Sequence, residues 1–84
     1  MSQPIPKWLQ ERYALLLKEF GDREFTFGLA RKLLKKDQEK IVSISLSKLK
    51  KAGWLEIIRL DPNDSRKRYY KLKTLNEIFK GMNQ

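Results

Sequence analysis

The sequence contains neither cysteine nor histidine. Their absence excludes disulfides, thiolate nucleophiles, zinc fingers and imidazole acid–base chemistry within this chain. A glycine-rich phosphate-binding loop is also missing, and the ten acidic residues are scattered among basic ones instead of being paired in apolar surroundings. We therefore predict a protein that is not an enzyme and that needs neither a metal nor a cofactor.

Long hydrophobic runs are absent as well. None approaches the ~20 apolar residues that a membrane span needs, and the first residues lack the pattern of a signal peptide. A chain of 84 residues has room for one domain, with a core of roughly fifteen apolar side chains. We expect a single cytoplasmic domain over residues 1–84, with no membrane partner.

The chain has 19 basic and 10 acidic residues, and the excess positive charge is concentrated in one stretch. Residues 40–73 hold ten basic and three acidic residues, so most of the net charge of +9 lies there. Such asymmetry indicates a polyanionic partner, above all nucleic acid. The alternative is a small, thermophilic type of protein that carries many surface lysines.

A helix is predicted over residues 38–52, within this basic stretch. Val42, Leu46 and Leu49 form one narrow apolar stripe at helical spacing. We expect Asp37 to cap the amino end and Gly53 to end the helix. The opposite side is polar and basic, with Lys40, Ser43, Ile44, Ser47, Lys50 and Lys51.

A β-hairpin is predicted over residues 54–73. Both of its strand segments are rich in β-branched and aromatic residues, and the eight residues 61–68 between them include proline, asparagine and aspartate. We therefore expect a long, charged tip. In the second strand, Tyr70 and Leu72 share one face of the sheet and Tyr69 lies on the other.

The flanking segments predict three further helices. The first, over residues 6–20, has its apolar side formed by Leu9, Tyr13, Leu16, Leu17 and Phe20, while Trp8 and Leu15 lie outside this stripe. The second, over residues 27–35, is capped by Thr26, follows a short strand at residues 23–25, and turns inward Leu29, Ala30, Leu33 and Leu34. The last, over residues 75–80, begins with a Thr74/Glu77 capping box and stops at Gly81.

Together these elements predict an α+β fold, a winged helix-turn-helix with a three-helix core, a hairpin wing and a short C-terminal helix. The third helix suits the major groove of duplex DNA. We predict base-edge contacts by Lys40, Ser43, Ile44, Ser47 and Lys48, with Lys51 nearer the backbone. Because this face holds two serines and no arginine, asparagine or glutamine, we expect modest sequence specificity.

Two other basic clusters complete the predicted DNA surface. The hairpin tip is expected to contact a minor groove or the phosphates through Arg66, Lys67 and Arg68. Lys35 and Lys36, with Arg31 and Lys32, are candidate phosphate contacts of the helix before the recognition helix; a solvated helix face is the alternative. Asp61 and Asp64 are interpreted as turn formers and as local partners of Arg66 or Arg68.

The run from Ser45 to Leu72 resembles the recognition helix and wing of winged-helix transcription regulators, particularly the multiple-antibiotic-resistance (MarR) type and related archaeal families. The matching positions are Leu46, Leu49, Gly53, Leu55, Asp61, Asp64, Arg66, Tyr70 and Leu72, and the segment from Phe25 to Leu33 matches the preceding helix. The resemblance implies double-stranded DNA binding in transcription regulation, with Arg66 as a wing contact.

The chain departs from that family in length, since its regulators use additional terminal helices to dimerise and to form an effector pocket. We therefore expect no small-molecule ligand. A homodimer through the first and last helices stays open, as does packing of these helices within one chain. Two other functions remain as alternatives: a winged-helix module or subunit that binds protein, and an RNA-binding domain in which Tyr69 stacks on an unpaired base.

Overall fold

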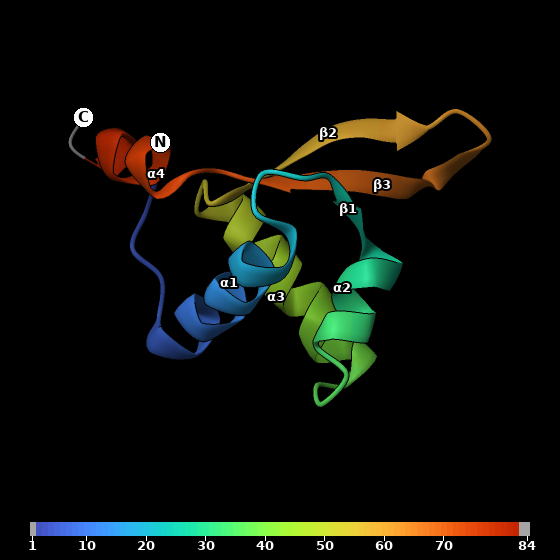
Figure 1. Ribbon diagram of the computed structural model, residues 1–84, viewed down its shortest axis with the longest axis horizontal. Helices are drawn as coiled ribbons and strands as arrows, with labels where there is room; N and C mark the ends of the chain where they lie inside the picture. Colours follow the sequence, from blue (N-terminus) through green and yellow to red (C-terminus); the bar gives the residue numbers. More distant parts are fainter. Residues whose placement is uncertain (1, 83–84) are drawn as a thin grey trace.

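The computed structural model describes residues 2–82, apart from the side chains of Ser65 and Arg66. The fold is α+β, as predicted, with the helices and strands in the order α1 (Lys7–Phe20), β1 (Phe25–Thr26), α2 (Phe27–Leu33), α3 (Glu39–Lys51), β2 (Leu55–Asp61), β3 (Asp64–Leu72) and α4 (Leu75–Met82). Helices α1, α2 and α3 lie on one side of the sheet, the tip of the β2–β3 hairpin projects beyond them, and α4 lies at the opposite end (Figure 1).

The core lies between the three helices and the sheet. The predicted stripe of α3 is buried, since Val42 and Leu49 are fully covered, and α1 contributes Leu9 and Leu16 from its own stripe. Burying each such aliphatic side chain stabilises the fold by roughly 1.5–3 kcal/mol. Trp8 and Leu15, which lie outside the stripe of α1, are 37% and 48% exposed.

Tyr13 joins α1 to the end of the sheet. Its hydroxyl donates a hydrogen bond of 2.6 Å to the carbonyl oxygen of Lys73, and its ring meets Trp54 edge-on at a centroid distance of 5.0 Å. Trp54 in turn donates its indole N–H to the carbonyl oxygen of Gln3 at 2.7 Å. These contacts fix the start of β2 and the end of β3 against α1.

The sheet is antiparallel, with the strand order β1-β3-β2. Phe25 pairs with Tyr70 across β1 and β3, and Phe25 also stacks on Phe20 at 4.6 Å. The short first strand therefore lies at Phe25–Thr26 and not at residues 23–25, because Phe25 is the residue that enters the core.

Helix α3 ends as predicted but begins differently. Gly53 adopts a left-handed φ of 84°, its N–H donates to the carbonyl oxygen of Lys50, and the N–H of Trp54 donates to that of Leu49. This is a Schellman termination. At the amino end the prediction of an Asp37 cap is wrong: Gln38 is the N-cap residue, without a side-chain cap bond, since Asp37 is bound by Arg12 of α1.

Helix α2 is shorter than the predicted 27–35. It ends at Leu33 because Leu34 leaves helical geometry, with φ −95° and ψ 41°, and turns its side chain into the core. Thr26 caps the helix as expected by accepting a hydrogen bond of 3.4 Å from the N–H of Leu29. The inward placement of Leu29 is wrong: this side chain is 44% exposed, since it lies about 100° around the helix from buried Ala30.

The hairpin tip is tighter than the predicted eight-residue loop. Asp61 pairs with Asp64, which leaves Pro62 and Asn63 as the turn, and the Asp61 carboxylate accepts the N–H of Asn63 at 2.8 Å. The strand register shifts next to this pair. Between the pair Leu60–Arg68 and the pair Asp61–Asp64, β3 has three extra residues, 65–67, and β2 has none. A local side-chain bond thus closes the turn, and a bulge accommodates the extra residues.

Helix α4 begins with the predicted cap. The Thr74 hydroxyl accepts the N–H of Glu77 at 3.1 Å and donates to the Glu77 carboxylate at 3.2 Å. The helix continues through Gly81 to Met82, contrary to the predicted stop, because Gly81 does not adopt the positive φ of a helix-ending glycine. Gly81 lies against Ser2, where a Cβ would be 2.7 Å from the serine Oγ. Within residues 2–82, no helix combines the length and the apolar character that crossing a membrane requires.

Candidate nucleic-acid interface

Helix α3 presents two rows of residues beside its buried stripe. The outer row consists of Lys40, Ile44, Lys48 and Lys51, and the inner row of Ser43, Ser47 and Lys50, which faces the hairpin. Five of the six predicted contacts of α3 are exposed. The exception is Ile44, which is half-buried, so less of its side chain is available for a thymine methyl than the sequence suggested.

A hollow of about 220 Å³ separates the inner row of α3 from the hairpin. We call it the α3–hairpin hollow. Its two charged residues, Lys50 and Arg68, come from different elements, and no carboxylate is among the described residues around it. Its lining is formed by Phe27, Ser43, Leu46, Ser47, Lys50, Ile57, Arg68 and Tyr70.

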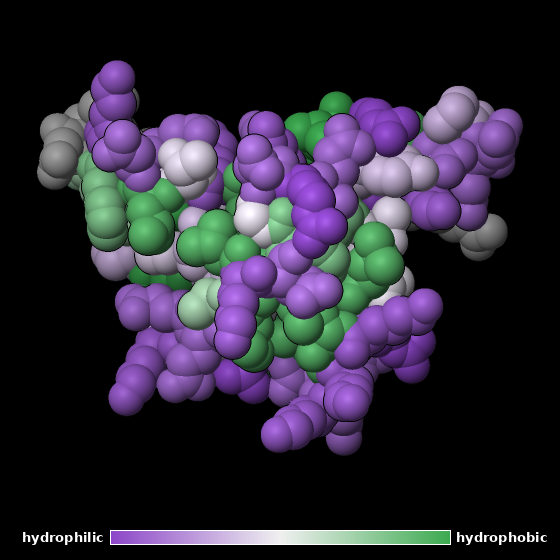
Figure 2. Space-filling view, viewed as in Figure 1, coloured by the Kyte–Doolittle hydropathy of each residue, from purple (hydrophilic) through white to green (hydrophobic). Residues whose placement is uncertain are grey.

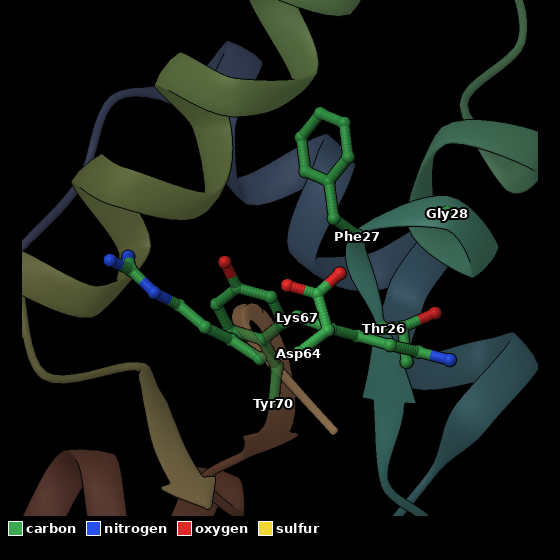
Figure 3. Close-up of a pocket in the computed structure, with 7 residues that line it drawn as sticks. Thr26, Phe27, Gly28, Asp64, Lys67 and Tyr70 are labelled. Atoms are coloured by element: carbon green, nitrogen blue, oxygen red, sulfur yellow. The ribbon is translucent and has the colours of Figure 1, made fainter. Parts of the chain in front are cut away.

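A second hollow, of about 530 Å³, adjoins the first along the hairpin. The two share Phe27, Arg68 and Tyr70, and the second adds Lys67 and Asp64. Figure 3 shows Phe27 and the hydroxyl end of Tyr70 directed toward α3. Two of the predicted wing residues, Lys67 and Arg68, therefore border this second hollow, whose other wall is formed by Thr26, Phe27 and Gly28.

The basic residues of α2 form a different surface. Lys35 and Lys36 are exposed in the turn after this helix, and Lys35 borders a hollow of about 540 Å³ together with Arg31 and Lys32. Two carboxylates line the same hollow: Glu39, which lies 3.8 Å from Arg31, and Asp37, which Arg12 binds. The α2 surface therefore mixes cations with carboxylates, whereas no carboxylate is among the described residues that line the α3–hairpin hollow.

The side chain of Tyr69 lies within a network on the hairpin. The Arg59 guanidinium lies 4.0 Å from the centre of the tyrosine ring and also bonds the Glu24 carboxylate at 3.0 Å. The tyrosine hydroxyl donates to Asp61 at 3.2 Å. Arg59 therefore covers one face of the Tyr69 ring, the ring that would stack on an unpaired base if the protein bound RNA.

The Asp61 carboxylate is the acceptor at the centre of the hairpin tip. The N–H of Asn63 contributes most to lowering the pKa of Asp61, and the Tyr69 hydroxyl and the charge of Lys67 lower it further. Asp61 is thus a turn former, as predicted. Among the described side chains, however, its hydrogen-bond partner is Tyr69 and not Arg68, and the backbone N–H of Asn63 also donates to it.

The charge of α3 is largely uncompensated. Ion pairs in which both side chains are described join Arg12 to Glu11 and Asp37, Arg31 to Glu39, and Arg59 to Glu24. No lysine of α3 takes part in these pairs. The backbone of Arg66 lies in the bulge of β3, but the predicted contact of its side chain falls outside the described part.

Two polar residues that were not among the predicted contacts also line the α3–hairpin hollow: Lys50 and Tyr70. The sequence placed Lys50 on the polar side of the helix, in its last turn, and Tyr70 on the same face of the hairpin as Leu72. A signal was present in both elements. Ser43, Ser47 and Lys50 follow helical spacing, and Arg68 and Tyr70 follow strand alternation.

Two comparisons bear on this surface. No family model matches the sequence. Over 70 residues the chain is 40% identical to the type I restriction enzyme MjaVIII methylase subunit of Methanocaldococcus jannaschii. That match covers 83% of this chain and 12% of the relative, so the chain spans a small part of the relative's length.

Proposed function

We propose that this chain is a winged helix-turn-helix protein that binds double-stranded DNA and acts as a transcriptional regulator without catalytic activity. Helix α3 enters the major groove, and the β2–β3 hairpin, as the wing, lies on the minor groove or the backbone. Three helices followed by an antiparallel hairpin are compatible with this fold.

The uncompensated lysines of α3 carry the proposal. Lys40, Lys48 and Lys51 are exposed along one row, and no carboxylate of the described residues is bound to any of them. A row of cations on a single exposed helix is the arrangement that phosphates beside a major groove require. Figure 2 shows hydrophilic side chains over the projecting hairpin as well, and Lys67 and Arg68 there extend the positive surface.

The relative supports a DNA-related role in coarse terms. A methylase subunit of a restriction enzyme is compatible with a segment that holds DNA, but its name does not distinguish a regulator from a DNA-binding part of a larger assembly. The DNA surface of α3 and the hairpin is the same in both cases.

Fluorescence anisotropy with a labelled random duplex of about 25 base pairs tests the proposal. If the protein neutralises ~5 phosphates, log K falls with log salt with a slope of about −4 to −5. Duplex RNA of the same length is the competitor, and it should compete weakly because a helix cannot read the narrow RNA major groove. Absence of duplex binding at low salt, or a preference for RNA, would contradict the proposal.

A second candidate function is binding of another protein. Trp8 and Leu15 on α1 are exposed, and so are Leu75 and Phe79 on α4, at 46% and 55%. Large exposed apolar side chains are found at interaction surfaces. Sedimentation equilibrium of the wild type and of Phe79→Ser separates the cases: a homodimer that the substitution dissociates supports a protein interface, and a monomer over a wide concentration range contradicts a homodimer.

A further inference from the structure

The α3–hairpin hollow is formed by polar groups from two elements that face one another. Ser43, Ser47 and Lys50 lie on α3, four and three residues apart, and Arg68 and Tyr70 lie two residues apart on β3. The volume of about 220 Å³ is several times the ~30 Å³ that one water molecule occupies in the liquid. The hollow thus has room for a tetrahedral anion.

The chemistry of the lining favours an anion. Lys50 and Arg68 supply positive charge, the two serines supply hydroxyl donors, and the described lining holds no carboxylate. Phe27, Leu46 and Ile57 form apolar parts of the wall. Charges beside apolar surface attract an anion more strongly than charges in open water do.

Tyr70 adds a donor that the fold itself does not use. Its ring is held by stacking on Phe25 at 5.8 Å, and the residue as a whole is only 9% exposed. No described side chain makes a hydrogen bond with its hydroxyl, and no buried side-chain oxygen or nitrogen among the described residues is left without a partner. The hydroxyl is therefore not fully covered by the protein, and Tyr70 lines both hollows.

We propose that the α3–hairpin hollow seats one backbone phosphate of the DNA strand beside the groove that α3 enters. Lys50 and Arg68 pair with it from opposite sides, and the hydroxyls of Ser43, Ser47 and Tyr70 donate to its oxygens. The inference rests on the proposed function. A phosphate fixed between helix and hairpin sets the register of α3 in the groove.

A double-mutant cycle measured by duplex anisotropy tests the site. Lys50→Ala and Arg68→Ala each weaken binding by about tenfold, as expected for a hydrogen-bonded charge. Because both bind one phosphate, the double variant loses less than the product of the two single losses. The matched control is a second cycle that combines Arg68→Ala with Lys51→Ala. Lys51 is the exposed neighbour of Lys50 in the outer row, so the losses of affinity from these two substitutions should multiply.

Tyr70→Phe provides a charge-neutral check. It weakens binding by about fivefold, the value of one hydrogen bond, and leaves the salt slope unchanged. Circular dichroism and thermal melts verify that every variant folds. The phosphate site is overturned if the affinity losses of Lys50→Ala and Arg68→Ala multiply in the double variant, or if Tyr70→Phe loses no affinity. In that case the proposed function still stands, provided that the wild type binds the duplex. A wild type that binds no duplex at low salt overturns both.

Discussion

Arg12 binds both carboxylate oxygens of Asp37, with Nη2 to Oδ1 at 2.9 Å and Nε to Oδ2 at 3.2 Å. The pair links α1 to the residue just before the N-cap of α3, across 25 positions of sequence. Its hydrogen bonds are the main reason why the pKa of Arg12 is raised above its ordinary value. Two parallel bonds restrict orientation more than one does, so Arg12 helps to fix where α3 begins.

Arg12→Ala should therefore lower the free energy of unfolding by about 1–2 kcal/mol, because the Asp37 carboxylate, 15% exposed, loses a charged partner. For a domain of this size each kcal/mol corresponds to roughly 4–8 °C in melting temperature. Arg31→Ala is the control. Its 3.8 Å contact with Glu39 is exposed at both side chains, so the change should be within about 0.5 kcal/mol. Equal effects of the two substitutions would show that Arg12 has no special role.

Patterns confined to one helix predicted the structure best. The buried stripe of α3, its glycine termination and the Thr74–Glu77 cap each depend on residues a few positions apart. The Asp37 cap failed because its carboxylate found a partner 25 residues away, which periodicity does not reveal. Leu34 ended α2 early for a similar reason, since tertiary burial outweighed helix propensity.

The hairpin shows the same limit. Composition predicted a turn within residues 61–68, but the Asx bond from Asp61 to Asn63 determined where it closes. The position of Tyr69 against Arg59, and of Arg68 and Tyr70 against α3, depends on the register of β3. The sequence alone leaves that register open, so it could identify the basic side chains but not the hollow that they form.

The hairpin tip should depend on pH through Asp61. Hydrogen bonds from Asn63 and Tyr69 lower the pKa of this carboxyl below its ordinary value of 3.8. The ionised carboxylate therefore stabilises the fold at pH values above 3.8, and this stabilisation is lost as the pH falls through the lowered pKa. An NMR titration of the side-chain carboxyl carbon should give a midpoint below 3.8. Tyr69→Phe should raise this midpoint and Tyr70→Phe should not, since of these two tyrosines it is Tyr69 whose hydroxyl donates to Asp61. A midpoint at or above the ordinary value would contradict the bonded tip.

Two glycines should respond in opposite directions to alanine. Gly53→Ala places a side chain at φ 84°, in the left-handed region, and should destabilise the fold by about 1–2 kcal/mol. Gly28 lies within α2, and a Cβ there would meet the Thr26 oxygen at an ordinary 3.8 Å. Gly28→Ala should therefore stabilise the protein by about 0.5–1 kcal/mol. Urea unfolding of both variants measures the difference, and a destabilising Gly28→Ala would indicate that α2 does not tolerate the added methyl group.

The outer row of α3 should dominate the salt dependence of DNA binding. If Lys40, Lys48 and Lys51 each neutralise one phosphate, alanine at any of these exposed positions reduces the magnitude of the slope of log K against log salt by about one. Lys18→Ala is the control, since it removes the same charge from an exposed position on α1. It should change affinity only slightly and leave the slope as it is. If Lys18→Ala reduces the slope as much as Lys51→Ala does, binding follows from net charge alone and α3 does not lie in the groove.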